Sequence, residues 1–369
     1  MPQYVWQHEN WTAFSYDAEV VLPVLSRFRK KQGYFLRQIH ELGFTDELNT
    51  YAKILEEEAV QTSAIEGIVL DREGVRSSIA NHLGIEQAGL RDATRETHGL
   101  VTVLLEAVHN YSQPLDKLCL FRWHSLLFPS GMSDFRTIEA GTWRKTKMQV
   151  VSGAFGRQKV HFEAPLPENV EEEMQGFFAW WKNTQDTMDG IIRTAFAHLY
   201  FVTVHPFEDG NGRLARVLSD IALAQDEDMA KRFYSVSAQI MRERNAYYDI
   251  LEKTQKGDGD CTEWLVWFIG CLERSITSAC LIIENILAKA EFWKKHRDTD
   301  LNERQRKVIN RLLDAGKDGF EGGLTTQKYC GMTKCSRATA FRDIEDLLAK
   351  NILSPLSKGG RSTAYTVVG

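Results

Sequence analysis

The chain has 369 residues, 43% of them hydrophobic and 26% charged, which is typical of two or three folded domains and excludes a disordered chain. Its net charge of −5 argues against nucleic-acid binding by the chain as a whole, although it leaves room for one basic domain. We find no secretory signal, no stretch approaching the ~20 apolar residues of a transmembrane helix, and no CxxC pair among six cysteines. We therefore expect a cytoplasmic protein with no membrane partner.

Most of the chain has apolar residues three and four positions apart, which predicts a mainly α-helical fold. The segment from Ile191 to Val204 is apolar on most of its circumference, so we expect a central helix that Pro206 ends. Further helices are predicted from Leu214 to about Asp226 and from Thr262 to Lys295.

The pattern changes between Trp143 and Pro165. The β-branched pair Val150-Val151 is followed by a turn containing glycines and then by Val160–Phe162, which predicts a β-hairpin. A lone hairpin in a helical domain is marginally stable by itself. We interpret it as a segment that contacts another molecule, such as a substrate.

The last 70 residues differ in composition from the rest. From Asp300 to Gly369 there are 12 Lys and Arg against 8 Asp and Glu, a net charge of +4. The predicted order is helix Glu303–Ala315, helix Thr325–Cys330, turn Gly331–Thr333, helix Ser336–Lys350 capped by Ser336, and a hairpin at Gly359-Gly360. This order is typical of a winged helix. We expect domains at 1–90, 91–297 and 300–369.

The segment from His205 to Arg216 carries the clearest chemistry. His205 can accept a proton near neutral pH, and Asp209 can hold a hard cation such as Mg²⁺. Gly210–Gly212, before a helix, can form a backbone cradle for an anion, and Arg213 and Arg216 share one helical face beside it. Each feature alone has an ordinary structural explanation, as a helix cap, a turn or a solvated face. Their joint occurrence in this order favours a phosphate site.

These residues match every specified position of His-Pro-Phe-x-(Asp/Glu)-Gly-Asn-Gly-Arg-x-x-Arg, and the chain thus resembles the Fic family. The resemblance implies a protein adenylyltransferase, which transfers AMP from ATP to Ser, Thr or Tyr hydroxyls and releases pyrophosphate. His205 would deprotonate the hydroxyl, Phe207 would anchor the loop, and Asp209 would coordinate Mg²⁺. The residues implied to bind ATP and its phosphates are Gly210, Asn211, Gly212, Arg213, Leu214 and Arg216.

The resemblance extends to the hairpin, which is similar to the flap on which the family docks a protein substrate by strand addition, here at 149–165. The flap and adenosine positions implied are Val150, Val151, Ser152, Gly153, Tyr247, Tyr248 and Gln255. A tyrosine pair on a helix is as often a core element. The resemblance also leaves self-modification and a homodimer open.

A second motif, Thr62-x-x-x-Glu66-Gly67, ends a helix predicted from about Asn49. By itself it is an ordinary helix terminus, where a carboxylate is mildly unfavourable. Beside a Fic motif it resembles the family's inhibitory helix, in which Glu66 would pair with Arg216 and hold ATP in a non-productive pose. Some members also use this glutamate to remove AMP from the target.

The expected architecture is a helical Fic core with a β-hairpin flap, an N-terminal region carrying the inhibitory helix at about 49–67, and a C-terminal winged helix. Two alternatives remain: another transfer or AMP removal by the same site, and a DNA-binding regulator whose Fic core senses nucleotide.

The winged helix could bind DNA or dock a protein. On the last predicted helix Arg337, Arg342 and Lys350 alternate with Asp343, Glu345 and Asp346, which is not the stripe expected for phosphate contacts. Lys334, Lys358, Arg361 and Arg337 could still cluster near the start of that helix. We expect protein docking rather than DNA binding by 300–369.

Overall fold

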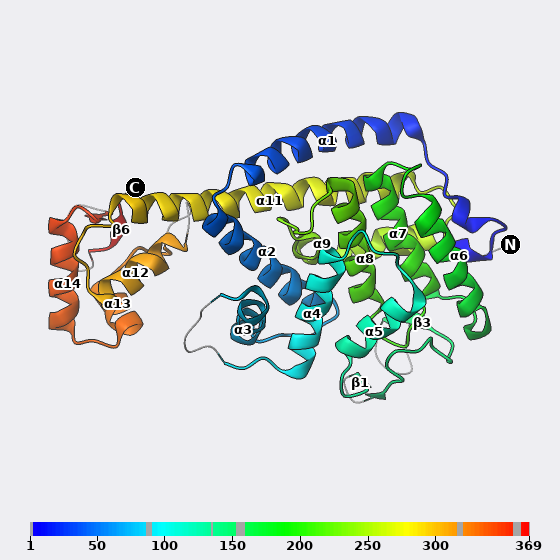
Figure 1. Cartoon of the computed structure of the whole chain (residues 1–369), viewed down its shortest axis with the longest axis horizontal. Helices are drawn as coiled ribbons and strands as arrows, with labels where there is room; N and C mark the ends of the chain where they lie inside the picture. The colour runs from blue at the N-terminus through cyan, green and yellow to red at the C-terminus, as the bar shows by residue number, and fades with distance from the viewer. Residues whose placement is uncertain are drawn as a thin grey trace. The chain divides into compact units, whose positions relative to one another are not determined.

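The computed structural model describes residues 3–85, 91–133, 136–152, 159–315, 320–356 and 363–368. Within them the fold is mainly helical, as predicted, with three two-stranded sheets (Figure 1). The chain divides into two compact units, residues 1–42 with 47–279, and residues 43–46 with 280–369. The N-terminal helices thus belong to the same compact unit as the predicted core.

The helices up to the end of the first unit are α1 (Ala18–His40), α2 (Phe44–Ile65), α3 (Arg72–Leu83), α4 (Arg95–His109), α5 (Lys117–Leu127), α6 (Val170–Asn183), α7 (Gly190–Val204), α8 (Asn211–Glu227), α9 (Val236–Arg242), α10 (Arg244–Gln255) and α11 (Thr262–Lys295). Short 3₁₀ helices lie at Val5–Gln7, Trp11–Ala13 and Pro167–Asn169.

The centre of the first unit is the pair α7 and α8, which lie side by side (Figure 1). Every residue of α7 from Ile191 to Val204 is buried, which confirms the predicted central helix. Asp189 caps its start by accepting hydrogen bonds from the backbone N–H of Ile191 and Ile192 at 2.9 and 3.3 Å. The helix ends at Val204, directly before His205 and Pro206, and the following loop begins there.

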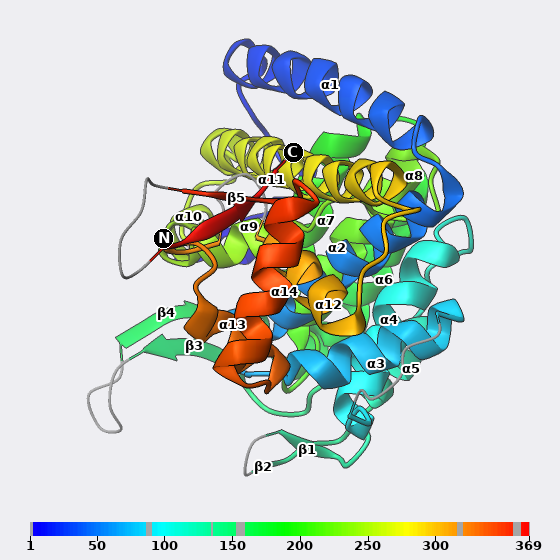
Figure 2. The ribbon, with the colours of Figure 1, turned by 90° about the vertical axis from the view of Figure 1, so that its left-hand side faces the viewer.

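Two hairpins project from the first unit (Figure 2). The predicted one is confirmed, since β3 (Gln149–Ser152) pairs antiparallel with β4 (Lys159–Glu163). Its register shifts between Val150 and Val151, which is a β-bulge. The second hairpin, β1 (Met132–Ser133) with β2 (Arg136–Thr137), was not predicted, because two-residue strands carry no periodic signal.

The second unit contains α12 (Glu303–Leu313), α13 (Thr326–Thr333), α14 (Arg337–Ala349) and the antiparallel pair β5 (Leu353–Pro355) and β6 (Tyr365–Val367). Ser336 caps α14 through a 3.2 Å bond from the Thr339 N–H, as predicted. The predicted turn at Gly331–Thr333 is wrong, because these residues continue α13 and the left-handed turn residue is Lys334, with φ 52°. The glycines at 359 and 360 lie outside the described residues.

α11 has the predicted bounds but corrects another expectation. Among the described residues it is the one helix of sufficient length and apolar composition to cross a membrane. Of its most apolar stretch, 44% is buried within the structure. Trp264 and Leu265 are fully buried, and the Trp264 indole N–H donates to the Ala195 carbonyl of α7 at 2.9 Å. Packing in the core explains the apolar composition of its first turns.

Candidate active site

The loop between α7 and α8 is held in a single tight conformation. His205 takes left-handed backbone angles, φ 52° and ψ 59°, and Gly210 has φ 78°. α8 begins at Asn211, three residues before the predicted start at Leu214. The reason lies in the Asn211 side chain, which accepts from the Phe207 N–H at 2.9 Å and donates to the Phe207 carbonyl at 2.8 Å. These bonds close the loop onto the first turn of the helix.

Phe207 is fully buried and stacks on His124 of α5, with ring centroids 4.2 Å apart. Both nitrogens of His124 are committed to backbone groups. Nδ1 accepts from the Gly141 N–H at 2.9 Å, so Nε2 carries the proton and donates to the Asp209 carbonyl at 3.1 Å. His124 therefore fixes the position of two loop residues, a role that the sequence reading missed.

This arrangement predicts how stability depends on pH. Burial lowers the pKa of His124 to about 4, whereas an unfolded histidine titrates near 6.5. Below about pH 6.5 His124 becomes protonated in the unfolded chain but stays neutral in the folded chain. The contribution of His124 to the free energy of unfolding therefore falls between pH 6.5 and 4, by up to ~1.4 kcal/mol per pH unit. We expect the stability gap between wild type and His124→Asn, measured by urea unfolding, to narrow as the pH falls across this window.

His109→Asn, at the exposed end of α4, provides the control for loss of a histidine. The change measured for it across the same window is subtracted from the change measured for His124→Asn. A constant gap between wild type and His124→Asn would contradict the burial of a neutral imidazole at this position.

The hydrogen bonding of His205 leaves one ring nitrogen able to accept a proton. Its Nδ1 lies 3.1 Å from the Val202 carbonyl, which can only accept, so Nδ1 carries the proton and Nε2 presents a lone pair. Burial lowers the pKa of His205 and outweighs the Val202 hydrogen bond, which raises it. The Arg144 charge lowers the pKa further. The imidazole is therefore neutral at pH 7 and able to accept a proton.

Arg144 is a second residue that the sequence reading missed. Its buried guanidinium donates to the carbonyls of His205 at 2.6 Å, Pro165 at 2.6 Å and Thr146 at 2.9 Å. Its backbone N–H donates to the Pro206 carbonyl at 2.9 Å. Arg144 thus ties the loop between α7 and α8 to both ends of the β3–β4 hairpin. The local sequence gave no signal for this role, because Arg144 lies in a polar, lysine-containing stretch five residues before β3.

Asp209 is the candidate metal ligand. Its Oδ1 accepts from the Gly210 N–H at 2.6 Å, and its Oδ2 accepts from the Ser133 hydroxyl of β1. Among the described residues no group of three or more His, Cys, Asp and Glu side chains gathers as a metal site. A single carboxylate fits Mg²⁺ bound together with nucleotide phosphates, because Mg²⁺ commonly takes one or two protein carboxylates and completes its shell with phosphate and water oxygens.

The N-terminus of α8 carries the two arginines of the motif. Arg213 is buried, with its guanidinium carbon 4.7 Å from the centre of the Phe128 ring. Arg216 is 2% exposed and donates to Thr62 through Nε, at 2.7 Å from Oγ1, and through Nη2, at 2.9 Å from the carbonyl. The same Nη2 donates to Oε1 of Glu66 at 2.7 Å. The structure thus brings together residues about 150 positions apart.

The carboxylate of Glu66 also lies against the start of α8. A Cβ added to Gly212 would come within 2.1 Å of its Oε1, so only glycine allows this approach. The first N–H groups of a helix lack partners inside the helix and attract anions. The Glu66 side chain, which is 29% exposed, therefore occupies the position at which the helix N-terminus would stabilise a bound phosphate most strongly.

The end of α2 is fixed by further contacts. Gly67 has φ 85°, and the Ile68 N–H donates to the Ser63 carbonyl at 3.0 Å, which closes the helix. The Ile65 carbonyl accepts from Arg244 Nε at 2.9 Å and from the Tyr248 hydroxyl at 3.4 Å. α10 thus supports the helix that carries Glu66.

The adenosine positions implied by the resemblance differ in exposure. Tyr247 is buried and its hydroxyl lies 2.8 Å from His198 Nε2, while Gln255 is buried and donates to Thr203 Oγ1 at 3.2 Å. Tyr248 is the most exposed of the three residues, with 37% of its surface accessible to solvent.

On the hairpin, Val150 packs against the cluster of Tyr4 and Phe162, and Val151 is exposed. Ser152 ends β3 and pairs with Lys159, whereas Gly153 lies outside the described residues. The two adjacent valines point to opposite faces of the strand, so one packs against the core and the next lies at the surface.

Two protein-family models match separate parts of the chain. Residues 114–223, which include α5, both hairpins, α7 and the motif loop, match the model of the Fic/DOC family. The chain carries a Fic domain. Residues 4–85, which include α1 to α3 and Glu66, match a second model described as a domain of unknown function, DUF4172.

Curated relatives of the Fic domain are nucleotide-transferring enzymes by name. The chain is 31% identical over 140 residues to protein adenylyltransferase Fic of Nematostella vectensis, which is 38% of this chain and 29% of that protein. It is 35% identical over 122 residues to protein adenylyltransferase fic-1 of Caenorhabditis elegans, covering 33% and 21%. It is 33% identical over 110 residues to a uridine 5′-monophosphate transferase of Xanthomonas campestris, covering 28% and 20%. The match thus spans less than a third of each relative.

Solved Fic structures share the fold. A Fic family protein from Desulfovibrio desulfuricans aligns with a TM-score of 0.54 at 18% identity, over 95% of this chain and 96% of that chain. Residues 134–508 of Caenorhabditis elegans Fic-1 align with a TM-score of 0.52 at 20% identity, over 74% of each chain. At this identity the likeness supports the fold alone.

Proposed function

We propose that the protein transfers AMP from ATP to hydroxyl groups of proteins, including its own, and that Glu66 inhibits this transfer. The observation that carries the proposal is the loop from His205 to Arg216, where a neutral imidazole with an available Nε2 stands beside a helix N-terminus and a buried arginine. Two curated relatives named as adenylyltransferases support the choice of AMP.

The proposed reaction places the triphosphate at the start of α8. The backbone N–H groups of the first turn and the guanidinium of Arg216 stabilise its negative charge. Nε2 of His205 removes the proton of the attacking hydroxyl, whose oxygen forms a bond to the α-phosphorus while the bond to the pyrophosphate oxygen breaks. Positioning and charge stabilisation supply most of the catalysis in such a transfer, which suits a loop fixed by Asn211, His124 and Arg144.

Asp209 would hold Mg²⁺ in this scheme. Bound Mg²⁺ supplies neutralisation of phosphate charge. Ser133 donates a hydrogen bond to the Asp209 carboxylate and orients it. Protein substrates would dock along β3 as an added strand, because a two-stranded sheet leaves an unpaired edge on each strand.

The proposal is tested by incubating the purified chain with ATP labelled at the α-phosphate and Mg²⁺, and measuring label retained on protein. Label is expected with wild type and more strongly with Glu66→Gly, and none with Glu66→Gly/His205→Ala. Label from γ-labelled ATP should not be retained. Absence of α-label from every variant, while each still binds ATP, would overturn AMP transfer and favour a nucleotide-sensing role.

A second donor has one specific observation in its favour. The relative from Xanthomonas campestris is named a uridine 5′-monophosphate transferase. Parallel reactions with α-labelled ATP, UTP, CTP and GTP distinguish ATP from UTP as the donor, and retention of more uridylate than adenylate would replace ATP as the proposed donor.

Release of AMP from the labelled protein, lost on Glu66→Gln, would show that Glu66 also supports the reverse reaction.

The pH dependence of transfer follows from His205. A base must be unprotonated, and because burial lowers the pKa of His205, we expect kcat/KM of Glu66→Gly to hold down to about pH 6.5 and to fall only at more acidic pH. The Glu66 charge raises that pKa, so its loss moves the fall toward lower pH than in wild type. ATP binding measured at each pH separates proton transfer from nucleotide affinity. A fall centred above pH 6.5 would contradict this assignment.

A further inference from the structure

The last helix of the second unit, α14, is divided into an inward and an outward face. Asp343 faces inward, where its carboxylate accepts from Arg304 Nε at 2.9 Å, from the Tyr329 hydroxyl at 2.9 Å and from Asn302 Nδ2 at 3.0 Å. These contacts tie α14 to α12 and α13. They remove from the surface a negative charge that counted against phosphate binding in the sequence.

Asp346 is also used within the unit. Its Oδ2 accepts from Gln305 Nε2 at 2.7 Å and from Lys350 Nζ at 2.6 Å. Glu345 is thus the one acidic residue of α14 that stays exposed, one turn beyond Phe341 toward the C-terminal end. The N-terminal half of the helix carries no acidic residue at all.

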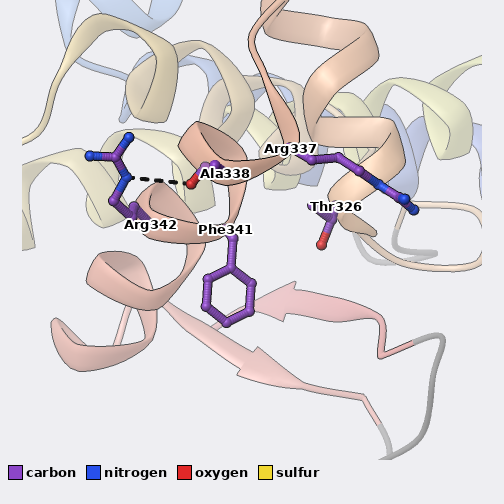
Figure 3. A pocket seen from close by; sticks show the side chains of 5 residues that line it. All are labelled: Thr326, Arg337, Ala338, Phe341 and Arg342. Carbon is purple, nitrogen blue, oxygen red and sulfur yellow. Dashed lines mark hydrogen bonds between the residues drawn. The ribbon is translucent and has the colours of Figure 1, made fainter.

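The outward face of that half is basic and partly aromatic. Arg337, Ala338, Phe341 and Arg342 are exposed, and with Thr326 of α13 they line an open cavity of about 620 Å³ (Figure 3). Phe341 is 54% exposed, and Figure 3 shows the two arginine side chains directed to opposite sides of it.

Neither arginine is used by an ion pair inside the unit. Across the described part of the chain, Arg337 makes no ion pair, and Arg342 makes a 3.4 Å hydrogen bond from Nε to the Ala338 carbonyl of its own helix. Lys334, at the turn before α14, is exposed and likewise without an ion pair among the described residues. Three cations therefore face solvent around the start of one helix.

We propose that this outward face of α14, defined by Lys334, Arg337, Phe341 and Arg342, binds double-stranded DNA. An exposed helix following a tight turn after another helix has the size to enter the major groove with its N-terminal half. The cations would neutralise phosphates on both sides of the groove, and the Phe341 ring would contact base edges such as thymine methyl groups. This role is independent of the proposed nucleotide transfer.

A protein partner fits this face less well. Phe341 is the one exposed large hydrophobic side chain on α13 and α14 within the described residues, so the face lacks the apolar centre of a protein interface. Residues 300–369 have a net charge of +4 although the whole chain carries −5, so the positive charge that DNA attracts is concentrated in this part of the sequence. Because the proposed contacts are made to phosphates, we expect binding that is strongest at low salt and weakens steeply as salt rises.

The test uses the full chain and a fluorescein-labelled duplex of mixed sequence, with anisotropy measured between about 50 and 200 mM salt. Wild type is expected to bind, with log K falling linearly with log salt concentration. Arg337→Ala/Arg342→Ala should lower the affinity and reduce that slope by about two, one for each lost phosphate contact. Phe341→Ser should lower the affinity with little change of slope.

The matched control is Lys307→Ala/Arg311→Ala, which removes the same charge from exposed positions of α12. Its slope should stay close to that of wild type. An equal loss of DNA affinity in the control variant would show that the affinity depends only on overall charge, and it would overturn the assignment of the DNA contact to α14. No anisotropy change at the lowest salt, or tighter binding of single-stranded RNA than of duplex, would also overturn it. Unchanged thermal melting of each variant confirms that it is folded.

Discussion

Glu66→Gly is expected to raise transfer of label from α-labelled ATP to protein by about 10- to 100-fold. Oε1 of Glu66 lies 2.7 Å from Nη2 of Arg216, a guanidinium that is 2% exposed. A charge-assisted hydrogen bond of this kind contributes about 1.5–3 kcal/mol, which ATP must overcome before its phosphates can use the arginine. Removing the carboxylate also clears the approach to Gly212 at the start of α8.

Two further variants make this prediction specific. Glu57→Gly removes the same charge from the same helix, but Glu57 pairs with Arg72 at 2.8 Å and lies outside the active site. It should leave transfer near the wild-type level. Glu66→Gln keeps an oxygen for Arg216 and loses the charge, so its activity should fall between wild type and Glu66→Gly. Equal activation by Glu57→Gly would indicate general loosening of α2 in place of direct competition.

Gly99→Ala is expected to destabilise the first unit by about 3 kcal/mol. In an isolated helix the same change would stabilise by ~1 kcal/mol, because alanine has the higher helix propensity. Here a Cβ at Gly99 would lie 1.9 Å from the carbonyl oxygen of Leu126, a backbone atom of α5 that cannot rotate away. α4 and α5 would have to separate, and α5 carries His124, which holds the catalytic loop.

Gly33→Ala is the control, since Gly33 lies in α1 and a Cβ there would meet no atom within 4 Å. It should raise stability by ~0.5–1 kcal/mol in urea unfolding, as helix propensity alone predicts. Opposite signs for the two variants would confirm that α4 and α5 pack through backbone contact at Gly99. If Gly99→Ala were stabilising, that contact would be contradicted.

Features whose causes are local in the chain were predicted from sequence. The continuous apolar run of α7 and the bounds of α11 follow from periodicity, and the Ser336 cap follows from side-chain chemistry at a helix start. The residues from His205 to Arg216 could be read as one site because they are adjacent on one loop and one helical turn. Composition does not distinguish a core helix from a membrane span, so the apolar stretch of α11 is compatible with either by length and composition alone.

The tertiary structure alone decided which distant groups complete that site. Arg144 and His124 hold the loop from other elements, and nothing in their local sequence records those contacts. Packing also turned Asp343 inward and left Arg337 outward, a division of charges between two faces of α14 that the order of residues alone did not indicate. Hydrophobic periodicity predicts which side of a single helix or strand is buried, from residues a few positions apart. Hydrogen bonds between segments tens to hundreds of residues apart depend on how helices pack, which only the folded chain specifies.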